Sequence, residues 1–122
     1  MSSGSGRGPF LRFRGRVVEV TKLDRKRWRA GVSGQPMKTG GDYCVLGLFF
    51  RQHGVGDYAL QHALLPDDLK LQWGYPVPTN LRDHRYGATI AELNDSQLPN
   101  AYLEGALVAA FKDAGLEVVW VN

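Results

Sequence analysis

The feature that most constrains the fold is an apolar run from Tyr43 to Phe50, in which no side chain carries a charge. Such a run must be buried on most of its surface, so it belongs at the centre of the domain. Asp42 precedes the run and is placed to cap a helix, and Gly54 follows it, where a positive φ costs glycine little. These flanks predict a buried helix over residues 42–54. Periodicity alone also allows a buried strand from Tyr43 to Phe50.

The size and composition of the chain indicate a single globular domain. With 122 residues, of which 43% are apolar and 22% are charged, the chain can bury a core without disulfides. Its one cysteine, Cys44, excludes an intramolecular disulfide and favours a reducing compartment. The apolar runs are far shorter than the roughly 20 residues of a membrane span, and the Ser/Gly-rich start lacks the apolar segment of a signal peptide. We therefore expect a cytoplasmic protein that does not bind membranes.

Three further segments complete the predicted fold. Residues 99–114 begin with a proline and carry apolar side chains at spacings of three and four, which predicts a helix with one apolar face. β-branched residues are concentrated in 16–21 and in 116–121, which predicts two short strands. We expect an α+β fold, in which these strands from the two chain ends form a small antiparallel sheet packed by helices 42–54 and 99–114.

The net charge of +3 conceals an asymmetry along the chain. Residues 1–38 hold ten Lys or Arg and two Asp or Glu, whereas the remainder hold five basic and ten acidic residues. We divide the chain into a flexible basic N-terminal arm over 1–15 and one globular domain over 16–122. A basic arm predicts an anionic partner, such as DNA, RNA or an acidic protein surface. The alternative is an arm that is only solvated or that packs on the acidic body of the same protein.

Aromatic residues and arginines are interleaved in the N-terminal segment. This pattern is typical of proteins that bind single-stranded nucleic acid by phosphate contacts and base stacking, and the arginines available for such contacts are Arg12, Arg14 and Arg16. The same pattern fits an edge strand whose charged side chains face water.

A second basic segment spans residues 22–31 and is predicted to form a short helix. Asp24 can cap this helix and Gly31 can end it, while Leu23 and Trp28 would hold it against the domain. In this arrangement four cationic side chains face outward as candidate binding residues: Arg25, Lys26, Arg27 and Arg29.

Residues 72–88 are predicted to be irregular, because Pro76 and Pro78 forbid a regular helix there. A loop of this length in a compact domain is either functional or disordered, and its aromatic residues favour an ordered one. Because aromatic residues and arginine are enriched at protein–protein hot spots, five side chains are candidates for binding a partner: Trp73, Tyr75, Arg82, Arg85 and Tyr86. The alternative is a loop that packs its aromatic side chains onto the core.

The sequence predicts no catalytic residue, metal site or cofactor. Cys44 would lie in the first turn of helix 42–54, where the helix dipole lowers the pKa of a thiol, but His53 lies nine residues further and about half a revolution away. A small buried cysteine is the simpler interpretation. Cys44, His53, His62 and His84 also lack the paired ligands, roughly two to five residues apart, that are typical of structural zinc.

Several short motifs follow one another between residues 22 and 121. The first is a tryptophan in a basic segment (Lys26–Gly31), and the second is a Cys-x-Leu-Gly helix (Cys44–Gly47). A Gly-Val turn (Gly54-Val55), a Leu-Asn-Asp turn (Leu93–Asp95) and a Gly-Leu-x-Val ending (Gly115–Val121) follow. In this order they resemble a group of small, mostly uncharacterised proteins encoded by phages and prophages. The chain departs from that group in having one cysteine where a doublet is frequent, and in its longer basic N-terminus. The resemblance implies a cytoplasmic accessory protein that binds and modulates a host factor, and it transfers no catalytic residue.

Three functions remain open on the sequence alone. The leading expectation is a non-enzymatic binding protein of phage or mobile-element type, an inhibitor that modulates a host protein, or a protein–nucleic acid complex, by steric protein–protein contact. The alternative is a nucleic-acid-binding protein that uses the basic N-terminal segment. The third is a small hydrolase built on Cys44 or on an Asp/His pair.

Overall fold

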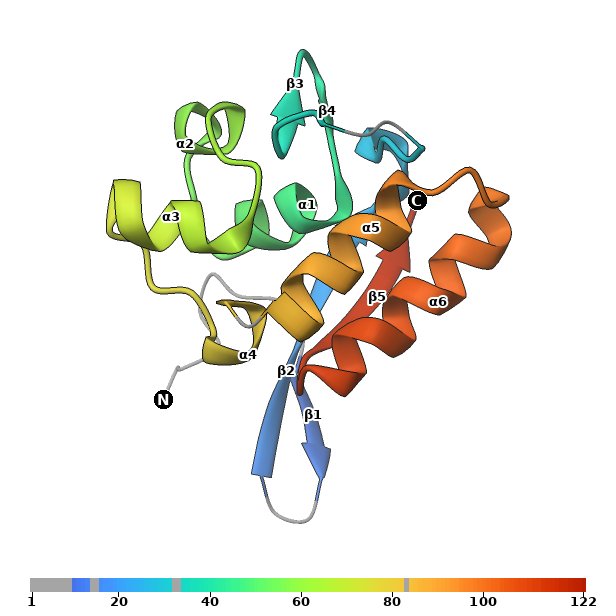
Figure 1. Cartoon of the computed structure of the whole chain (residues 1–122). Coiled ribbons are helices and arrows are strands. Elements are labelled where there is room, and N and C mark those ends of the chain that lie inside the picture. The colour runs from blue at the N-terminus through green and yellow to red at the C-terminus, as the bar shows by residue number, and fades with distance from the viewer. Residues whose placement is uncertain (1–9, 14–15, 32–33, 83) are drawn as a thin grey trace.

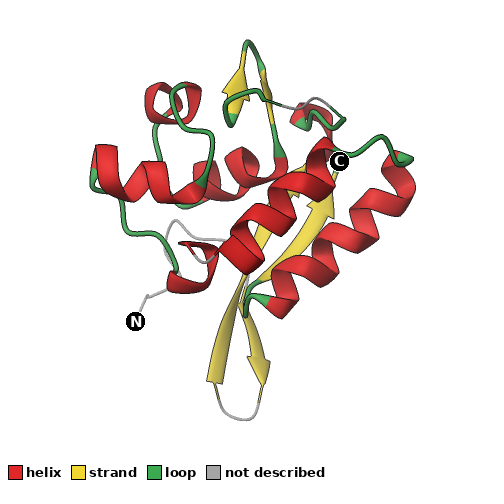
Figure 2. Cartoon of the chain, viewed as in Figure 1, coloured by secondary structure: helices red, strands yellow, loops and turns green. Residues whose placement is uncertain are grey.

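The computed structural model describes residues 10–13, 16–31, 34–82 and 84–122. It has an α+β fold in which helices cover one side of a small sheet (Figures 1 and 2). The sheet contains β1 (Phe10–Phe13), β2 (Arg16–Asp24) and β5 (Glu117–Val121), in the order β1-β2-β5. The strands predicted at the two chain ends are therefore confirmed, and the first of them continues to Asp24.

The pairing of the two chain ends differs from the prediction. β2 and β5 are parallel, with Val20 opposite Glu117 and Asp24 opposite Val121, so the predicted antiparallel pairing of these strands is wrong. The reason is the path of α6 (Asn100–Asp113), which runs back along the sheet before the chain enters β5 (Figure 1). Because of this return, β5 starts beside Val20 and runs in the same direction as β2. In this three-stranded sheet, β1 and β2 form the antiparallel pair.

β1 and β2 form a hairpin that extends beyond the helices (Figure 1). β5 pairs only with residues 20–24 of β2, and residues 16–19 pair instead with β1. The interpretation of the N-terminal segment as an edge strand is thus confirmed for residues 10–13, which had been assigned to the flexible arm. Residues 1–9 and 14–15 lie outside the described part of the chain.

The central apolar run forms α1 (Val45–Gln52), which begins three residues later than predicted. Asp42 does not cap this helix, because it lies in β4 (Asp42–Tyr43), which pairs with β3 (Lys38–Thr39). Cys44 is the cap residue, and its Sγ accepts a hydrogen bond from the backbone N–H of Gly47 at 3.4 Å. The predicted end is confirmed, since Gly54 follows the last helical residues with a φ of 91°.

The remaining elements are mostly helical. They are η1 (Arg25–Arg27), α2 (Asp57–Gln61), α3 (Pro66–Trp73), α4 (Thr79–Arg82), the π-helix η2 (His84–Ala88) and α5 (Thr89–Asp95). The prediction of an irregular segment over 72–88 is therefore wrong for 72–73, 79–82 and 84–88. Pro78 directly precedes α4 and starts it, because its carbonyl accepts from the N–H groups of Leu81 and Arg82.

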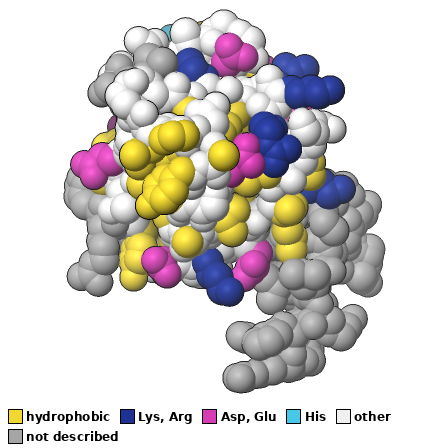
Figure 3. Space-filling view, turned by 90° about the vertical axis from the view of Figure 1, so that its right-hand side faces the viewer, with side chains coloured by type: hydrophobic (Ala, Val, Ile, Leu, Met, Phe, Trp, Pro, Cys, Tyr) yellow, Lys and Arg dark blue, Asp and Glu magenta, His cyan; other side chains and the backbone are white. Residues whose placement is uncertain are grey.

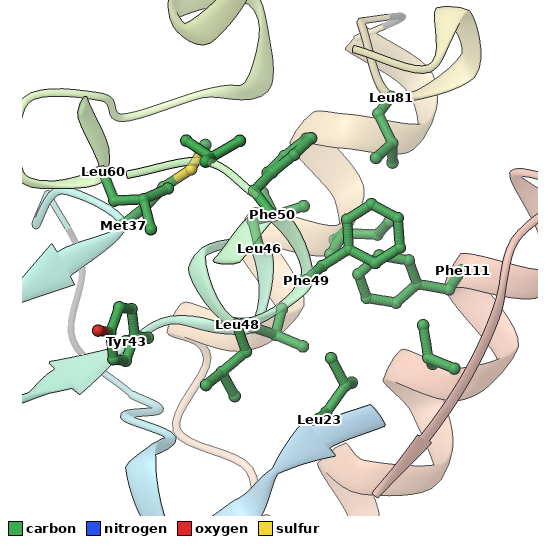
Figure 4. Packing of buried hydrophobic residues seen from close by; sticks show 14 of the residues in the cluster. Leu23, Met37, Tyr43, Leu46, Leu48, Phe49, Phe50, Leu60, Leu81 and Phe111 are labelled. Carbon is green, nitrogen blue, oxygen red and sulfur yellow. The ribbon is translucent and has the colours of Figure 1, made fainter. Parts of the chain in front are cut away.

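The core surrounds α1, with Leu23 of β2 on one side and Met37 and Leu60 on the other (Figure 4). α1 packs on β2, α6 packs on β5, and α5 packs against both α1 and α6. The ring of Phe49 stacks on Phe111 with centroids 5.2 Å apart and meets Phe50 edge-on at 5.3 Å. These three rings are almost completely buried, and burial of each contributes about 1.5–3 kcal/mol to folding. The predicted helices at 42–54 and 99–114 are thus both core elements.

Candidate binding groove

The basic segment is fixed to the body of the protein by Trp28. The carboxylate of Asp24 caps η1 as predicted, accepting from the N–H of Lys26 at 3.0 Å. The helix stops after Arg27, because Trp28 is extended and its neighbour Arg29 donates its backbone N–H to the carbonyl of Tyr43 at 2.7 Å. The indole of Trp28 donates to Asn94 at 2.7 Å and lies 4.5 Å from the ring of Trp120. The predicted helix over 22–31 is thus reduced to one turn.

The four predicted cations of this segment have different surroundings. Arg25 makes a bidentate pair with Glu104 of α6, at 2.7 and 2.9 Å. Arg29 is half-buried, and its Nη2 donates to the carbonyl of Pro36 at 3.0 Å, so the prediction that it faces outward is wrong. Lys26 and Arg27 are exposed, as predicted.

An aromatic cluster, which consists of Tyr58, His62 and Trp73, lies on α2 and α3. The rings of Tyr58 and Trp73 meet edge-on with centroids 5.4 Å apart, and His62 lies 4.6 Å from Tyr58. Tyr58 is 65% exposed and Trp73 is 37% exposed, so the cluster presents aromatic surface to solvent. Trp73 was predicted as a binding residue, whereas Tyr58 and His62 were not.

An open groove of about 1030 Å³ adjoins this cluster. It lies between the C-terminal end of α1 and the irregular segment 75–78, with Lys70 of α3 and Arg82 of α4 along its edges. Tyr75 connects groove and cluster, because its hydroxyl accepts from the backbone N–H of Gly56 at 3.2 Å, two residues before Tyr58. Lys70 and Trp73 also lie one helical turn apart on α3.

Three cations line the groove: Arg51, Lys70 and Arg82. The Nε of Arg82 is 2.7 Å from Asp67, and the Nε of Arg51 is 3.9 Å from Asp57. Among the described residues that line the groove, none is an Asp or Glu. Arg51 and Lys70 were not predicted as binding residues, although Arg51 could have drawn attention as the first charged residue after the apolar run.

The other predicted residues of segment 72–88 are less accessible or not described. Tyr75 and Tyr86 are half-buried and pack against the core, which agrees in part with the alternative of a loop tucked onto it. The side chains of Arg12, Arg16 and Arg85, and the whole of Arg14, lie outside the described part of the structure.

The groove and the basic segment lie at opposite ends of the β2–β5 ladder. Leu116, which directly precedes β5, lines the groove, whereas Trp120 near the end of β5 contacts Trp28. The structure therefore places Tyr75 and Arg82 on the groove and Trp73 in the adjoining cluster, and it brings none of the three to the basic segment.

The geometry offers no support for nucleophilic catalysis at Cys44. Its burial raises the pKa of the thiol to about 11, and its Sγ caps the start of α1. His53 is engaged elsewhere, with its Nε2 2.8 Å from the hydroxyl of Thr21. Within residues 10–13, 16–31, 34–82 and 84–122, no three His, Cys, Asp or Glu side chains are grouped so that they could hold a metal ion.

A second exposed apolar surface lies on α6, whose outward residues include Ala101, Tyr102, Gly105 and Ala109. Tyr102 is 63% exposed. Figure 3, which views the molecule from the side on which α6 lies in Figure 1, shows hydrophobic side chains gathered over part of this face. No charged side chain lies among these four positions, in contrast to the groove.

No described helix is both long and apolar enough to cross a membrane. Comparisons of the chain with protein-family models, with curated proteins and with solved structures found no match.

Proposed function

We propose that this protein is a non-enzymatic binding protein that acts by protein–protein contact through the groove and the adjoining aromatic cluster. The observation that carries this proposal is the exposure of Tyr58 and Trp73 beside a groove edged by Arg51, Lys70 and Arg82. Tyrosine, tryptophan and arginine are the residues that most often dominate the binding energy of protein interfaces. The resemblance to phage-encoded proteins supports a host protein as the partner, which the bound chain would inhibit sterically.

Rigidity of this surface supports the same proposal. α1 contributes the groove residues Arg51 and Gln52 and is buried in the core over Val45–Phe50. Tyr75 is fixed by its hydrogen bond to Gly56. A preformed surface loses little conformational entropy on binding, so more of the contact energy appears as affinity.

The test compares capture of proteins from a bacterial lysate by the wild-type chain, Tyr58→Ala and Tyr102→Ala. The two tyrosines are almost equally exposed, at 65% and 63%, but only Tyr58 belongs to the cluster. We expect a partner that is retained by wild type and Tyr102→Ala and lost with Tyr58→Ala, because a hot-spot truncation costs about 2 kcal/mol or more. Loss of a captured protein with Tyr102→Ala but not with Tyr58→Ala would contradict the proposal and would indicate that α6 forms the contact surface.

The β1–β2 hairpin supports a second candidate function, nucleic-acid binding by the N-terminal segment. The hairpin extends beyond the helices, and Arg12 and Arg16 belong to its two strands (Figure 1). The test is fluorescence anisotropy of labelled single- and double-stranded DNA and RNA at two salt concentrations, with Arg12→Glu and Arg16→Glu as variants. Binding that weakens with salt and with both substitutions supports this function. Substitution is preferable to truncation, because truncation removes β1 from the sheet.

A further inference from the structure

We propose that the groove binds a short acidic segment of the partner that also carries an apolar anchor residue. This inference rests on the proposed function, and it adds the chemistry of the partner. It follows from the charge of the groove, from its apolar wall and from the carboxylates that lie beside two of its cations.

Charge complementarity selects an acidic occupant. Arg51, Lys70 and Arg82 line the groove, and none of the described lining residues is acidic. The ion pair of Arg82 with Asp67 is formed through Nε, which leaves the terminal nitrogens of the guanidinium group as donors. Lys70 is exposed and adds a third donor group. Carboxylates form strong charge-assisted hydrogen bonds with both residue types.

The apolar wall of the groove favours an occupant that also carries an apolar side chain. Val77, Pro78 and Leu116 are half-buried and line the groove, so their remaining surface is open to an occupant. Pro76 and Pro78 have no N–H, so this wall lacks two of the donors that a bound β-strand would use, and recognition relies mainly on side chains. The groove is open, and its volume of about 1030 Å³ lies at the upper end of the usual range of small-molecule pockets, which reaches roughly 1,000 Å³. These features favour a peptide segment over a small metabolite.

Nucleic acid fits the groove less well than an acidic peptide. Of the aromatic residues that line the groove, Phe49 and Phe50 are only 2% and 1% exposed and offer no ring face to a base, and Tyr75 is half-buried. The exposed rings lie in the adjoining cluster. Asp57 and Asp67 also lie beside two of the three cations, at 3.9 and 2.7 Å. A phosphodiester backbone carries a negative charge at every nucleotide and would be repelled by these carboxylates. A peptide can place single carboxylates at the cations and keep them away from Asp57 and Asp67.

The experiment selects a random peptide library on the immobilised full chain and measures the selected peptides by fluorescence anisotropy. Lys70→Glu reverses a charge at the groove, and Gln52→Trp fills the groove from an exposed position on its lining. Lys26→Glu is the matched control, since it makes the same charge change at an exposed position of η1. A single-stranded oligonucleotide is measured against the same variants.

We expect selected peptides that combine Asp or Glu with an apolar residue. Their affinity should fall at least about tenfold with Lys70→Glu and with Gln52→Trp, and less than about twofold with Lys26→Glu. Neutral or basic peptides that are blocked by Gln52→Trp but indifferent to Lys70→Glu would overturn the acidic partner and leave the proposed function standing. Peptides indifferent to both groove variants would overturn both. The inference would be overturned in favour of nucleic acid if the oligonucleotide bound the wild-type chain, lost affinity with both groove variants, and no acidic peptide were selected.

Discussion

The side chain of Asn94, at the end of α5, accepts a hydrogen bond from the indole N–H of Trp28 at 2.7 Å. The same Oδ1 accepts from the backbone N–H of Val45 at 3.0 Å, and Nδ2 donates to the carbonyl of Arg29 at 3.1 Å. Asn94 is 1% exposed. One buried amide therefore connects the basic segment, the start of α1 and the end of α5, and it corrects the expectation of a simple Leu-Asn-Asp turn at this place.

Replacement of Asn94 by alanine should destabilise the fold by about 3 kcal/mol. The substitution leaves the indole N–H of Trp28, the N–H of Val45 and the carbonyl of Arg29 without this partner, and each buried unsatisfied group costs roughly 1–3 kcal/mol. Chemical denaturation measures the change in the free energy of unfolding. Asn100→Ala, at an exposed position that begins α6, is the control and should change it by less than about 0.5 kcal/mol. Equal effects of the two substitutions would contradict the role assigned to Asn94.

Two glycines that both lie inside helices should respond in opposite directions to alanine. A Cβ at Gly47 of α1 would lie 2.2 Å from the carbonyl oxygen of Met37, so Gly47→Ala must displace backbone and should destabilise the protein by several kcal/mol, roughly 2–4. A Cβ at Gly105 of α6 would meet nothing within 4 Å. Gly105→Ala should raise the free energy of unfolding by about 0.5–1 kcal/mol, because alanine restricts the unfolded chain and favours the helix. Thermal and denaturant unfolding of both variants checks the pair, and stabilisation by Gly47→Ala would refute the close contact of α1 with Met37.

The thiol of Cys44 should be unreactive near neutral pH. Its pKa is raised to about 11 by burial, so little thiolate exists in the folded protein at pH 8. A thiol reagent such as Ellman's reagent should react far more slowly with native protein than with protein unfolded in urea. Comparable rates in the two states would show that the thiol is accessible and ionised.

The same pKa shift makes folding stability depend on alkaline pH. Because the pKa of Cys44 is higher in the folded than in the unfolded state, the thiol of the folded chain stays protonated up to a higher pH, and deprotonation favours the unfolded state. This contribution is fully present below the unfolded pKa of about 8.5 and is lost as pH rises toward 11. The decline in the free energy of unfolding over that interval should be smaller in Cys44→Ala than in wild type, as pH-dependent denaturation can measure.

The sequence predicted those elements whose local signals agree with their tertiary surroundings. The helix at 99–114 has a proline start, an apolar stripe and a glycine after its end, and the structure has α6 at Asn100–Asp113. The start of α1 was misplaced, because Asp42 could cap a helix equally well but is used in the ladder with Thr39. The direction of β5 relative to β2 depends on the whole path between them, which no short pattern encodes.

The candidate site was predicted only in part for the same reason. Trp73, Tyr75 and Arg82 stood out by residue type, but their neighbours include residues of α1 and α2, which come earlier in the chain and are brought to them only by the fold. Trp28 also stood out, yet its bond to Asn94 depends on a residue 66 positions away. The sequence therefore predicted candidate residues for binding, whereas their division between the groove and the basic segment required the fold.

Photo-crosslinking tests the central claim, that the groove and its aromatic cluster form the contact surface, most directly. A photoreactive phenylalanine analogue, p-benzoylphenylalanine, replaces Tyr58 of the cluster in one variant and Tyr102 of α6 in another, two positions of nearly equal exposure at 65% and 63%. Irradiation in a bacterial lysate should produce a discrete protein adduct through position 58 and none through position 102. A discrete adduct through position 102 alone would contradict the account and would make the apolar face of α6 the contact surface.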